Sequence, residues 1–333
     1  MYESYYQLRD KPFQLNPDPR FFYASRGHKR AFAYLEYGLS LGEGFIIITG
    51  DVGAGKTTLV QSLLRKLENG AYLIAELVST QLDAEDTLRS IAAAFGLKAE
   101  GITKSALLKG LEDYLRLAVR QGRKPLLVVD EVQNLNLRAI EELRMLSNFH
   151  EGDKPLLQSF LLGQPGFRDT LQSPEMLQLR QRVIASYHLG PLDRAETMQY
   201  ILHRLKTAGW QGSPSFSEGA FDAIFQFTAG VPRRINTLCD RILLFGYLEE
   251  RTHLGSSAVQ EVISDLRQEV HHQHANQEPP PPREEGTARP ATPDSALMDR
   301  MDGRMVAIER SVSRLIPLVR KVLYTLTSGK ENE

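Results

Sequence analysis

The chain has 333 residues, of which 42% are hydrophobic and 24% are charged, a composition typical of globular proteins with a substantial core. Its 40 basic and 41 acidic residues give a formal net charge of −1, which excludes an overall positive field that would draw it to nucleic acid. The single cysteine, Cys239, excludes an internal disulfide and fits a reducing compartment. It lies on the apolar side of a predicted helix, so we interpret it as a core residue.

The sequence contains no signal for export and no stretch that could cross a membrane. The first residues lack the basic and then apolar pattern of a signal peptide. No segment approaches the roughly 18 uncharged apolar residues that a bilayer-spanning helix needs. We therefore expect a cytoplasmic protein without a transmembrane segment, whose membrane contact would be peripheral.

Residues 1–42 form a leader before the first predicted strand. Pro12, Pro17 and Pro19 interrupt regular structure there, and a helical pattern of apolar residues follows them. The leader is also rich in tyrosine and phenylalanine. We expect these rings to pack the leader onto the domain that follows it.

Residues 43–190 alternate short apolar runs with helical patterns. Near-continuous apolar strands separated by helices predict an α/β fold with a parallel sheet of five strands, covered by helices on both faces. The ligands of such sheets bind at the carboxyl ends of the strands. The predicted strands are 45–49, 72–78, 125–129, 156–163 and 183–189.

Residues 191–270 show helical patterns only, which predict a small all-helical second domain. The predicted helices are 194–207, 218–229, 232–249 and 257–268.

The remaining sequence changes character twice. Residues 271–296 are rich in proline and poor in large apolar groups, which predicts a disordered linker. In residues 297–328 apolar residues follow alternating steps of three and four, a pattern typical of a coiled coil. Pro317 falls on the outward side, and the apolar face widens after it. Self-association is the favoured interpretation of this amphipathic helix, and docking on a protein partner or a membrane surface is the alternative.

A glycine-rich turn between the first strand and a helix carries the strongest functional signal. It has the pattern G-x-x-x-x-G-K-T, in which the glycines let main-chain amides surround a phosphate. The positive end of the following helix points at the same phosphates. The Lys56 ammonium reaches the β- and γ-phosphates, and the Thr57 hydroxyl binds Mg²⁺. The predicted phosphate-binding loop comprises Gly50, Asp51, Val52, Gly53, Ala54, Gly55, Lys56, Thr57 and Thr58.

An acidic pair follows the third predicted strand. Asp130 comes directly after a buried apolar run, where a carboxylate can hold the shell of a Mg²⁺ ion. Glu131 is next in the chain and can act as the general base that prepares a water molecule for the γ-phosphate. We predict that the two acids complete the nucleotide site.

Polar residues elsewhere fit further roles in phosphoryl transfer. Arg182, preferred over Arg180, precedes the fifth strand and is a candidate for an arginine that reaches a neighbouring subunit's nucleotide. Gln164 follows the fourth strand and is a candidate for sensing the γ-phosphate or orienting water. Arg233 opens a helix of the second domain and could couple domain closure to the phosphates. His28 and its neighbours are candidates for bordering the base.

Together these motifs resemble an AAA+ ATPase, a P-loop NTPase with a helical lid domain. More narrowly, the chain is similar to the general secretion pathway protein A (ExeA-type) family, and within it to the ATPase associated with exosortase/PEP-CTERM and exopolysaccharide loci. The resemblance covers about residues 1–270 and rests on the combined motifs. It is carried by the leader YYQLRDKPFQLNPDPRFFYASRGHKRAFAYLEYGL, by DEVQNL at 130–135, by LRMLSNF at 143–149 and by LGQP at 162–165.

The resemblance implies ATP as nucleotide, Mg²⁺ as cofactor, a ring-like or paired homo-oligomer, and work at the bacterial envelope, peripherally at the inner membrane. The chain departs from the secretion protein in one respect. Where that family carries a membrane span and a peptidoglycan-binding region, this sequence continues with the linker and the coiled-coil segment. A protein partner bound through the C-terminal helix is therefore expected instead of direct work on the cell wall.

The sequence thus predicts an ATPase that converts ATP and water to ADP and phosphate and drives conformational work for an envelope secretion or exopolysaccharide/PEP-CTERM export system. Two alternatives remain open at this point. One is a nucleic-acid-associated ATPase of the transposition-regulator or helicase-loader kind, which the near-neutral charge disfavours. The other is a nucleotide-switched scaffold, which the intact Asp130–Glu131 pair disfavours.

Overall fold

A five-stranded parallel sheet forms the centre of the first half of the chain. The computed structural model describes residues 1–16, 18–67, 70–78 and 83–275. Its strands lie in the order β2-β3-β6-β1-β7, so β6 separates the two strands that carry the predicted site motifs. The strands are β1 (Phe45–Gly50), β2 (Tyr72–Val78), β3 (Lys124–Asp130), β6 (Gln158–Gly163) and β7 (Val183–Leu189).

The predicted parallel sheet is confirmed, with each of the five apolar runs forming a strand. The fourth run starts two residues early in the prediction, because Leu156 and Leu157 are buried but lie outside the strand. All six residues of β1 and all six of β6 are buried, as expected for inner strands covered on both faces. A short hairpin, β4 (His150–Glu151) with β5 (Lys154–Pro155), precedes β6.

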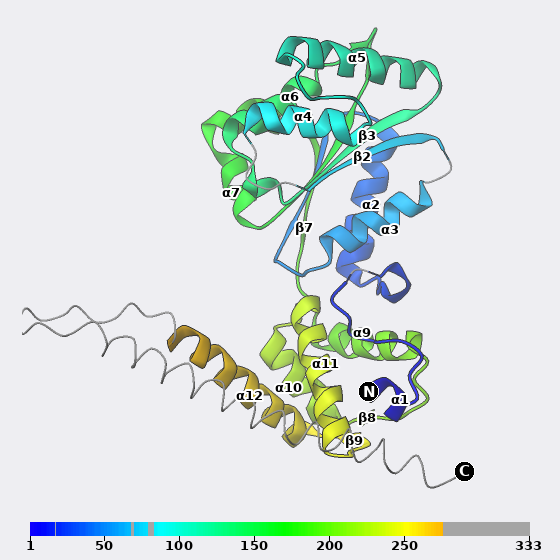
Figure 1. Cartoon of the computed structure of the whole chain (residues 1–333), viewed down its shortest axis with the longest axis vertical. Coiled ribbons are helices and arrows are strands. Elements are labelled where there is room, and N and C mark those ends of the chain that lie inside the picture. The colour runs from blue at the N-terminus through cyan, green and yellow to red at the C-terminus, as the bar shows by residue number, and fades with distance from the viewer. Residues whose placement is uncertain (17, 68–69, 79–82, 276–333) are drawn as a thin grey trace, which may run out of the picture. The chain divides into compact units, whose positions relative to one another are not determined.

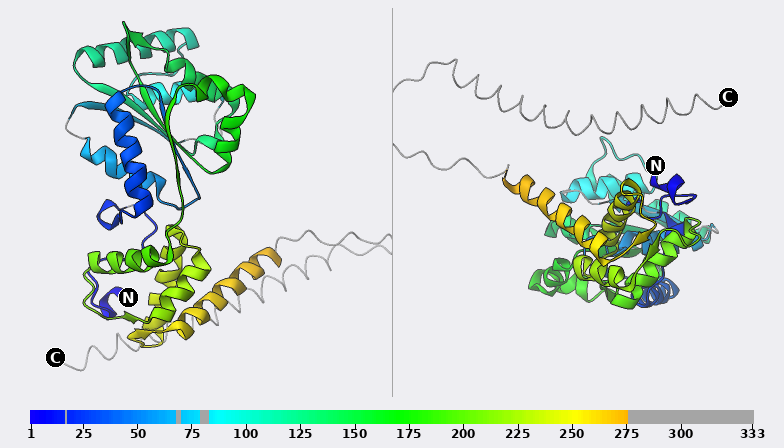
Figure 2. Two further views of the ribbon diagram at one scale, coloured as in Figure 1. Left: turned by 180° about the vertical axis from the view of Figure 1, so that it is seen from behind. Right: turned by 90° about the horizontal axis from the view of Figure 1, so that it is seen from below.

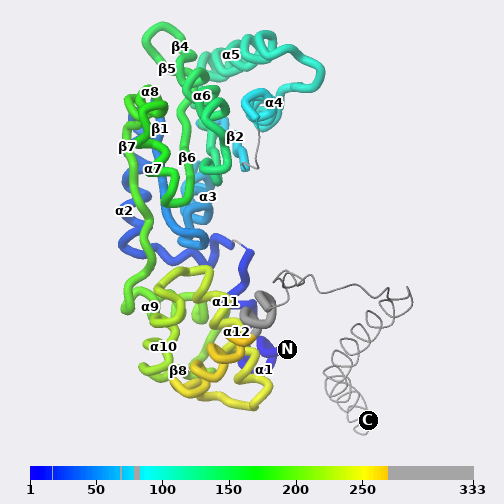
Figure 3. Tube along the Cα trace, turned by 90° about the vertical axis from the view of Figure 1, so that its left-hand side faces the viewer, coloured from blue at the N-terminus to red at the C-terminus, as the bar shows by residue number. Residues whose placement is uncertain are grey.

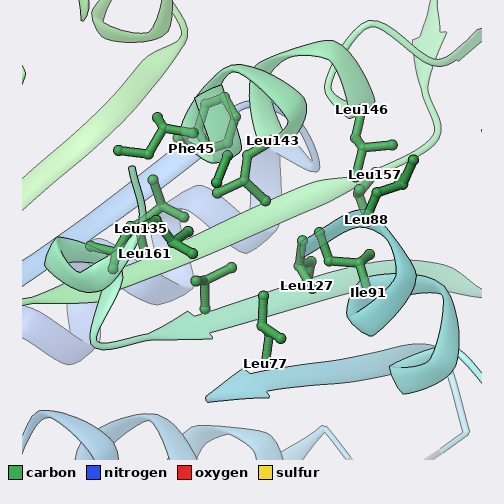
Figure 4. Packing of buried hydrophobic residues seen from close by; sticks show 14 of the residues in the cluster. Phe45, Leu77, Leu88, Ile91, Leu127, Leu135, Leu143, Leu146, Leu157 and Leu161 are labelled. Atoms are coloured by element: carbon green, nitrogen blue, oxygen red, sulfur yellow. The ribbon is translucent and has the colours of Figure 1, made fainter. Parts of the chain in front are cut away.

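Helices cover both faces of the sheet (Figures 1 and 2). The helices α2 (Arg26–Leu41) and α3 (Lys56–Lys66) pack on one face, where Leu35 and Leu59 meet Ile46 and Ile48 of β1. The other face carries the larger core, which Figure 4 shows around Leu127, Leu143 and Leu161. The helices of that side are α4 (Ala84–Ala94), α5 (Lys104–Arg120), η2 (Val132–Asn134), α6 (Leu137–Leu146), α7 (Gly166–Gln172), η3 (Pro174–Met176) and α8 (Leu177–Arg180).

Four helices after β7 form a separate hydrophobic core. The first of them begins with a complete capping box, in which Asp193 accepts from the Glu196 amide and Glu196 accepts from the Asp193 amide. Cys239 is fully buried in this core, as predicted, and burial raises the pKa of its thiol. The elements are α9 (Arg194–Thr207), β8 (Ser215–Phe216), α10 (Glu218–Thr228), α11 (Pro232–Leu248), β9 (His253–Leu254) and α12 (Ser256–Ala275).

The leader is divided between the two halves, whereas the prediction placed all of it on the sheet domain. The helix α2 does pack on the sheet, but α1 (Tyr2–Tyr5) and the residues up to Phe13 join the core of α9–α12. The Tyr2 hydroxyl donates to Asp240 of α11 at 2.5 Å, and the N-terminus lies beside that helix (Figure 3). Aromatic composition alone gave no sign of which core the rings would enter.

The leader then crosses from the helical half to the sheet. We call residues 12–16 and 18–23, which include η1 (Pro19–Phe21), the crossing segment. Arg204 of α9 is buried beneath it and donates to the carbonyls of Pro12 and Gln14. Its guanidinium also lies 5.1 Å from the centroid of the Phe21 ring. The crossing segment is therefore fixed to α9 by a charged donor.

The C-terminal part of the sequence is described only as far as Ala275. The helix α12 continues to that residue, so the first residues of the predicted linker are helical. The rest of the 271–296 linker and the whole 297–328 coiled-coil segment lie outside the described residues. Within the described ranges, no helix combines the length and apolar character needed to cross a bilayer.

Candidate nucleotide-binding site

The predicted phosphate-binding loop lies at the carboxyl end of β1 and leads into α3. Gly53 and Gly55 have φ of +83° and +98°, in the left-handed region that favours glycine. Close neighbours also require glycine at both positions. A Cβ on Gly53 would lie 2.2 Å from Cβ of Arg233, and a Cβ on Gly55 would lie 2.8 Å from Nε2 of His28. The loop is therefore shaped by its own conformation and by the side chains packed on it.

Lys56 is buried at the first turn of α3, with 5% of its surface exposed. Its ammonium donates to the carbonyls of Gly50 at 2.8 Å and Asp51 at 3.1 Å, so it is held over the loop. Burial lowers the pKa of Lys56, and the charges of Glu131 and Asp130 act in the opposite direction. The carboxylates thus favour the charged form, which is the form that binds phosphate.

Thr57, on the helix that follows β1, meets Asp130, at the end of β3, although β6 separates the two strands. The Thr57 hydroxyl donates to Asp130 Oδ2 at 2.6 Å. Mg²⁺ binds hard oxygen ligands and takes only one or two from the protein, with water and phosphate completing its shell. A hydroxyl and a carboxylate side by side at the carboxyl edge of the sheet are a donor set that fits this ion.

Glu131 occupies a strained and tightly bonded position. Its φ of +53° is unusual for a residue with a side chain, and it lies between the end of β3 and the start of η2. The Glu131 amide donates to Asp130 Oδ1 at 2.8 Å, which links the two acids. The side-chain amides of Gln133 and Gln164 both donate to Glu131 Oε2, the second at 3.2 Å. The carboxylate is therefore fixed at the edge of the sheet.

Gln164 lies where the prediction placed it, at the carboxyl end of β6, and it contacts the predicted base directly. Its main-chain amide also donates to Gln133 Oε1 at 2.9 Å. Gln133 had no predicted role, yet it joins the ends of β3 and β6. The sequence offered one indication, its place two residues after Glu131 on the turn that leaves the strand.

Arg233 joins the helical half to the loop. It lies in the first turn of α11, and its main-chain amide donates to the Gly53 carbonyl at 3.2 Å. Its Cβ occupies the space that a side chain on Gly53 would need. The N-terminus of α11 thus packs directly on the loop, and the role of Arg233 at the phosphates stays a prediction.

A cavity of about 540 Å³ opens beside the loop and extends toward the helical half. Phosphate-loop residues and Glu131 line one end of it. The crossing segment and the helices α9 and α11 line the other, through aromatic and amide side chains suited to a flat ring and its polar edge. Apart from the loop residues and Glu131, the lining comprises Gln14, Leu15, Asn16, Asp18, Phe21, Phe22, Tyr23, His28, Tyr200, Arg204, Pro232, Arg233 and Asn236.

The crossing segment and Arg204 were not predicted as parts of the site. No sequence motif marks them, because their contribution depends on a contact between residues about 190 positions apart. His28 was predicted near the base, and it does line this cavity, but its closest contacts are with the loop.

A larger cavity, about 710 Å³, lies between the N-terminal ends of α4 and α5 and the helices α6 and α8. It is lined mainly by acidic and apolar residues of those helices, and it contains none of the predicted site residues. Size alone therefore does not identify the nucleotide site, whereas the phosphate-binding motif does.

Arg182 and Arg180 are not brought to the loop of their own chain. Arg182 precedes β7, whose first residue pairs with the first residue of β1, so it lies at the opposite edge of the sheet. Its guanidinium donates to the Ser147 carbonyl at 2.8 Å and to Asn148. Arg180 is exposed and donates to the Leu171 carbonyl at 3.1 Å. A role for either arginine at a nucleotide would have to be played in a neighbouring subunit.

The strand order, the phosphate-binding loop, the acidic strand end and the helical region after the sheet define a P-loop NTPase of the AAA+ class. Residues 40–171 match the family model described as AAA domain. The chain has the AAA+ fold and is similar in sequence to general secretion pathway protein A. It is 37% identical to that protein of Aeromonas hydrophila over 248 residues, which cover 74% of this chain and 45% of the relative. The chain thus spans less than half the length of this relative.

Solved structures show the same fold at low sequence identity. The Aeropyrum pernix ORC2 protein, solved in ADPNP–ADP complexes, superposes with a TM-score of 0.59 at 18% identity, covering 76% of this chain and 71% of its own. The Thermotoga maritima RuvB Holliday junction branch migration motor gives a TM-score of 0.51 at 19% identity, covering 74% and 70%. At these identities the likeness extends to the fold alone.

Proposed function

We propose that the chain binds ATP with Mg²⁺, hydrolyses it to ADP and phosphate, and uses the cycle to drive conformational work. One observation carries the proposal. The ends of three parallel strands bring Lys56 and Thr57, the Asp130–Glu131 pair, and Gln164 to one edge of the sheet, in hydrogen-bonded contact from Thr57 to Asp130 and from Gln164 to Glu131. These are the groups that phosphoryl transfer needs, and they come from three separate parts of the sequence.

The loop and α3 would bind the phosphates. The loop amides and the positive end of α3 attract the β- and γ-phosphates, and the Lys56 ammonium would exchange its carbonyl partners for their oxygens. Thr57 and Asp130 would hold the ion, which supplies positive charge to the β- and γ-oxygens when bound. The remaining residues of the loop, Asp51, Val52, Ala54 and Thr58, contribute main-chain groups to the same cradle.

Glu131 would act as the general base. It takes the proton of a water whose oxygen attacks the γ-phosphorus, while the bond from that phosphorus to the β–γ bridging oxygen breaks and ADP leaves. The amides of Gln133 and Gln164 fix the carboxylate, so it need not be ordered during the reaction. A shift of Gln164 toward the γ-phosphate would remove its hydrogen bond to Glu131, and in this way Gln164 would sense the γ-phosphate.

Two arginines would connect nucleotide state to assembly. Arg233 follows the loop through its contact with Gly53 and is placed to report the phosphates to the helical lid. Arg182, or the more exposed Arg180, would complete the site of a neighbouring subunit in a ring-like or paired homo-oligomer. ATP-dependent change of sedimentation rate, and its loss in the Arg182→Ala or Arg180→Ala chain, would test this assembly.

The pathway proposal rests on the relative. General secretion pathway protein A covers 74% of this chain at 37% identity, which supports work for a bacterial envelope secretion or exopolysaccharide/PEP-CTERM export system. We place the protein in the cytoplasm or peripherally at the inner membrane, with a protein partner bound through residues 297–328. Comparing the proteins retained by the full-length chain with those retained by the chain ending at residue 275 tests the partner.

Glu131→Gln tests the enzymatic proposal most directly. The amide keeps the size of the side chain but cannot take the proton, so hydrolysis should fall by about 10²- to 10⁴-fold while ATP stays bound. Phosphate release and the binding of a fluorescent ATP analogue measure the two effects. Glu141→Gln is the matched control, because Glu141 lies on α6 in an ion pair with Arg144 and outside the site. Unchanged turnover in Glu131→Gln would remove the assigned base.

The same preparation tests the two alternatives. ATP-dependent and salt-dependent binding of duplex DNA would favour the nucleic-acid-associated class, although the net charge of −1 gives it no support. Retention of ATP with no turnover above background, even in the assembled state, would favour the nucleotide-switched scaffold.

A further inference from the structure

A histidine from the leader is buried against the phosphate-binding loop. His28 lies in the first turn of α2, is 5% exposed, and has an edge-to-face contact with Phe22 at 5.4 Å between ring centroids. Its position at the cavity admits three interpretations: a packing residue, a wall of the base pocket, or a support of the loop. The contacts of its two ring nitrogens distinguish them.

One ring nitrogen is fixed by the cap of its own helix. Ser25 Oγ accepts from the main-chain amide of His28 at 3.2 Å and lies 2.7 Å from Nδ1. A hydroxyl can accept one hydrogen bond and donate another, so Ser25 Oγ can accept from the amide and donate to Nδ1. In that arrangement the ring carries its proton on Nε2.

The other ring nitrogen faces the loop. Nε2 lies so close to Gly55 that a Cβ there would be 2.8 Å away, and a hydrogen bond of the ring with the Ala54 backbone opposes the lowering of its pKa by burial. Ala54 itself is 2% exposed, and Gly55 leads directly to Lys56. The ring therefore contacts the part of the loop whose amides precede the phosphate-binding lysine, which a residue that only walls the base would not do.

The helix that carries His28 is also bound to the helical half. The Arg26 amide donates to Glu196 Oε1 at 2.8 Å, and its guanidinium pairs with Asp193. Both acids belong to the capping box of α9. The first turn of α2 is thus fixed on one side to α9 and on the other, through His28, to the loop.

We propose that His28 is a positioning residue that holds Ala54 and Gly55 in the curvature that binds phosphate, and that links this curvature to the placement of α9. The inference rests on the proposed ATP-binding function and deepens it. Its essential contact is the Nε2–H facing the Ala54–Gly55 main chain. A side chain that replaces this donor should preserve the loop, whereas one that replaces only Nδ1 should not.

Two amide variants of the full-length chain separate the two nitrogens. The amide nitrogen of His28→Gln extends to the place of Nε2, and the amide of His28→Asn extends only to the place of Nδ1. We expect the Asn variant to raise the KM for ATP and the Kd of a fluorescent ATP analogue by about tenfold with kcat changed by less than about twofold. The Gln variant should remain within about threefold of the unchanged chain in all three values.

A merely structural role predicts a different pattern. Asn and Gln would then lower the thermal unfolding midpoint alike, and both would bind ATP as the unchanged chain does once folded. Equal affinity of the two variants would overturn the proposal. If both variants fail to fold, Ser25→Ala is the alternative, because it leaves the ring in place but frees Nδ1. An unchanged KM for ATP in that variant would also overturn the proposal.

The result is distinguishable from failure of the proposed function. If the unchanged chain does not bind ATP with Mg²⁺, the function itself is wrong. If the unchanged chain binds and hydrolyses ATP and His28→Asn does so equally well, only the role of His28 is wrong.

Discussion

The sheet half and the helical half of this chain contribute to the site in different ways. The sheet half places Lys56, Asp130 and Gln164 at or just after the carboxyl ends of strands. Because these strands pair in a fixed register, the positions of the three residues relative to one another are also fixed. The helical half has a core of its own and reaches the site through single side chains, chiefly Arg204 and Arg233. The sheet half is therefore suited to the proposed hydrolysis, and the helical half to sensing the nucleotide and closing over it.

The difference shows how a rigid site can be coupled to a movable part. Groups on paired strands keep their geometry when the surroundings shift, as catalysis requires. The contact of Arg233 with the loop consists of one main-chain hydrogen bond and a packed Cβ, so it can rearrange more easily than a paired strand. The crossing segment and the contact of α11 with the loop connect the two halves. Substitutions there test the coupling of the helical half to the site. Substitutions in either core test stability alone.

Of the substitutions considered, replacing Arg204 should have the largest effect on the attachment of the crossing segment to the helical half. Arg204→Met keeps the aliphatic volume but leaves the Pro12 and Gln14 carbonyls and the Tyr200 hydroxyl without this buried charged donor. We expect a loss of about 3 kcal/mol in the free energy of unfolding, measured by urea denaturation. Arg194→Met, on the same helix but in an exposed ion pair with Asp222, is the control and should change stability very little. Equal effects would show that Arg204 does not fix the crossing segment.

Adding one methyl group to the loop should test the contact with α11. Gly53→Ala meets Arg233 and adopts an unfavourable φ, so we expect about 2 kcal/mol of lost stability beyond the strain itself, together with weaker ATP binding. Gly96→Ala is the matched control, because its φ is +87° and no atom lies within 4 Å of the added carbon. Denaturation and nucleotide titration measure both. If the two variants lose the same stability, the loop is not packed on α11.

Acid should weaken the junction through His28. Burial lowers the pKa of His28 to about 4, against the opposing charge of Glu196, while the unfolded chain keeps the ordinary value near 6.5. The unfolded state therefore takes up a proton first, and stability falls as the pH drops from 6.5 toward 4. Between pH 7 and pH 5 the unchanged chain should lose about 2 kcal/mol more than His28→Gln in urea denaturation. Parallel losses in the two chains would contradict a buried neutral histidine.

The smallest effect concerns the arginines at the far edge of the sheet. Arg182→Ala removes the hydrogen bonds to Ser147 and Asn148 and should cost about 1 kcal/mol in its own chain. If Arg182 also acts in a neighbour, mixing Arg182→Ala with inactive Glu131→Gln chains should restore phosphate release. Arg180→Ala in the same mixture decides between the two arginines. No recovery in either mixture would exclude a role in trans for both.

The sheet and the glycine-rich loop after β1 were predictable because their determinants are local. Each strand is a short apolar run, and the loop from Gly50 to Thr58 has a fixed spacing that leaves little freedom of interpretation. The meeting of Asp130 with Thr57 also followed from general knowledge of parallel sheets, whose carboxyl ends share one edge.

The remaining features depend on contacts that spacing does not record. Nothing in the aromatic pattern of the leader distinguishes Tyr2, which enters the helical core, from Phe22, which packs beside the sheet. The burial of Arg204 requires a partner from the other end of the chain, and a lone arginine in a helix normally indicates an exposed residue. The hydrogen bond from Gln164 to Glu131 requires that β6 lies next to β3 in the sheet, which the sequence alone does not determine.

The bond between Tyr2 and Asp240 spans 238 positions, and this separation has a consequence for biosynthesis. Tyr2 leaves the ribosome long before Asp240 and the other members of the core that it completes. The sheet half can close around its own strands meanwhile, but the helical half must wait for its starting segment to be recaptured. Folding of the helical half is therefore governed by a long-range closure, which is slow relative to local helix formation.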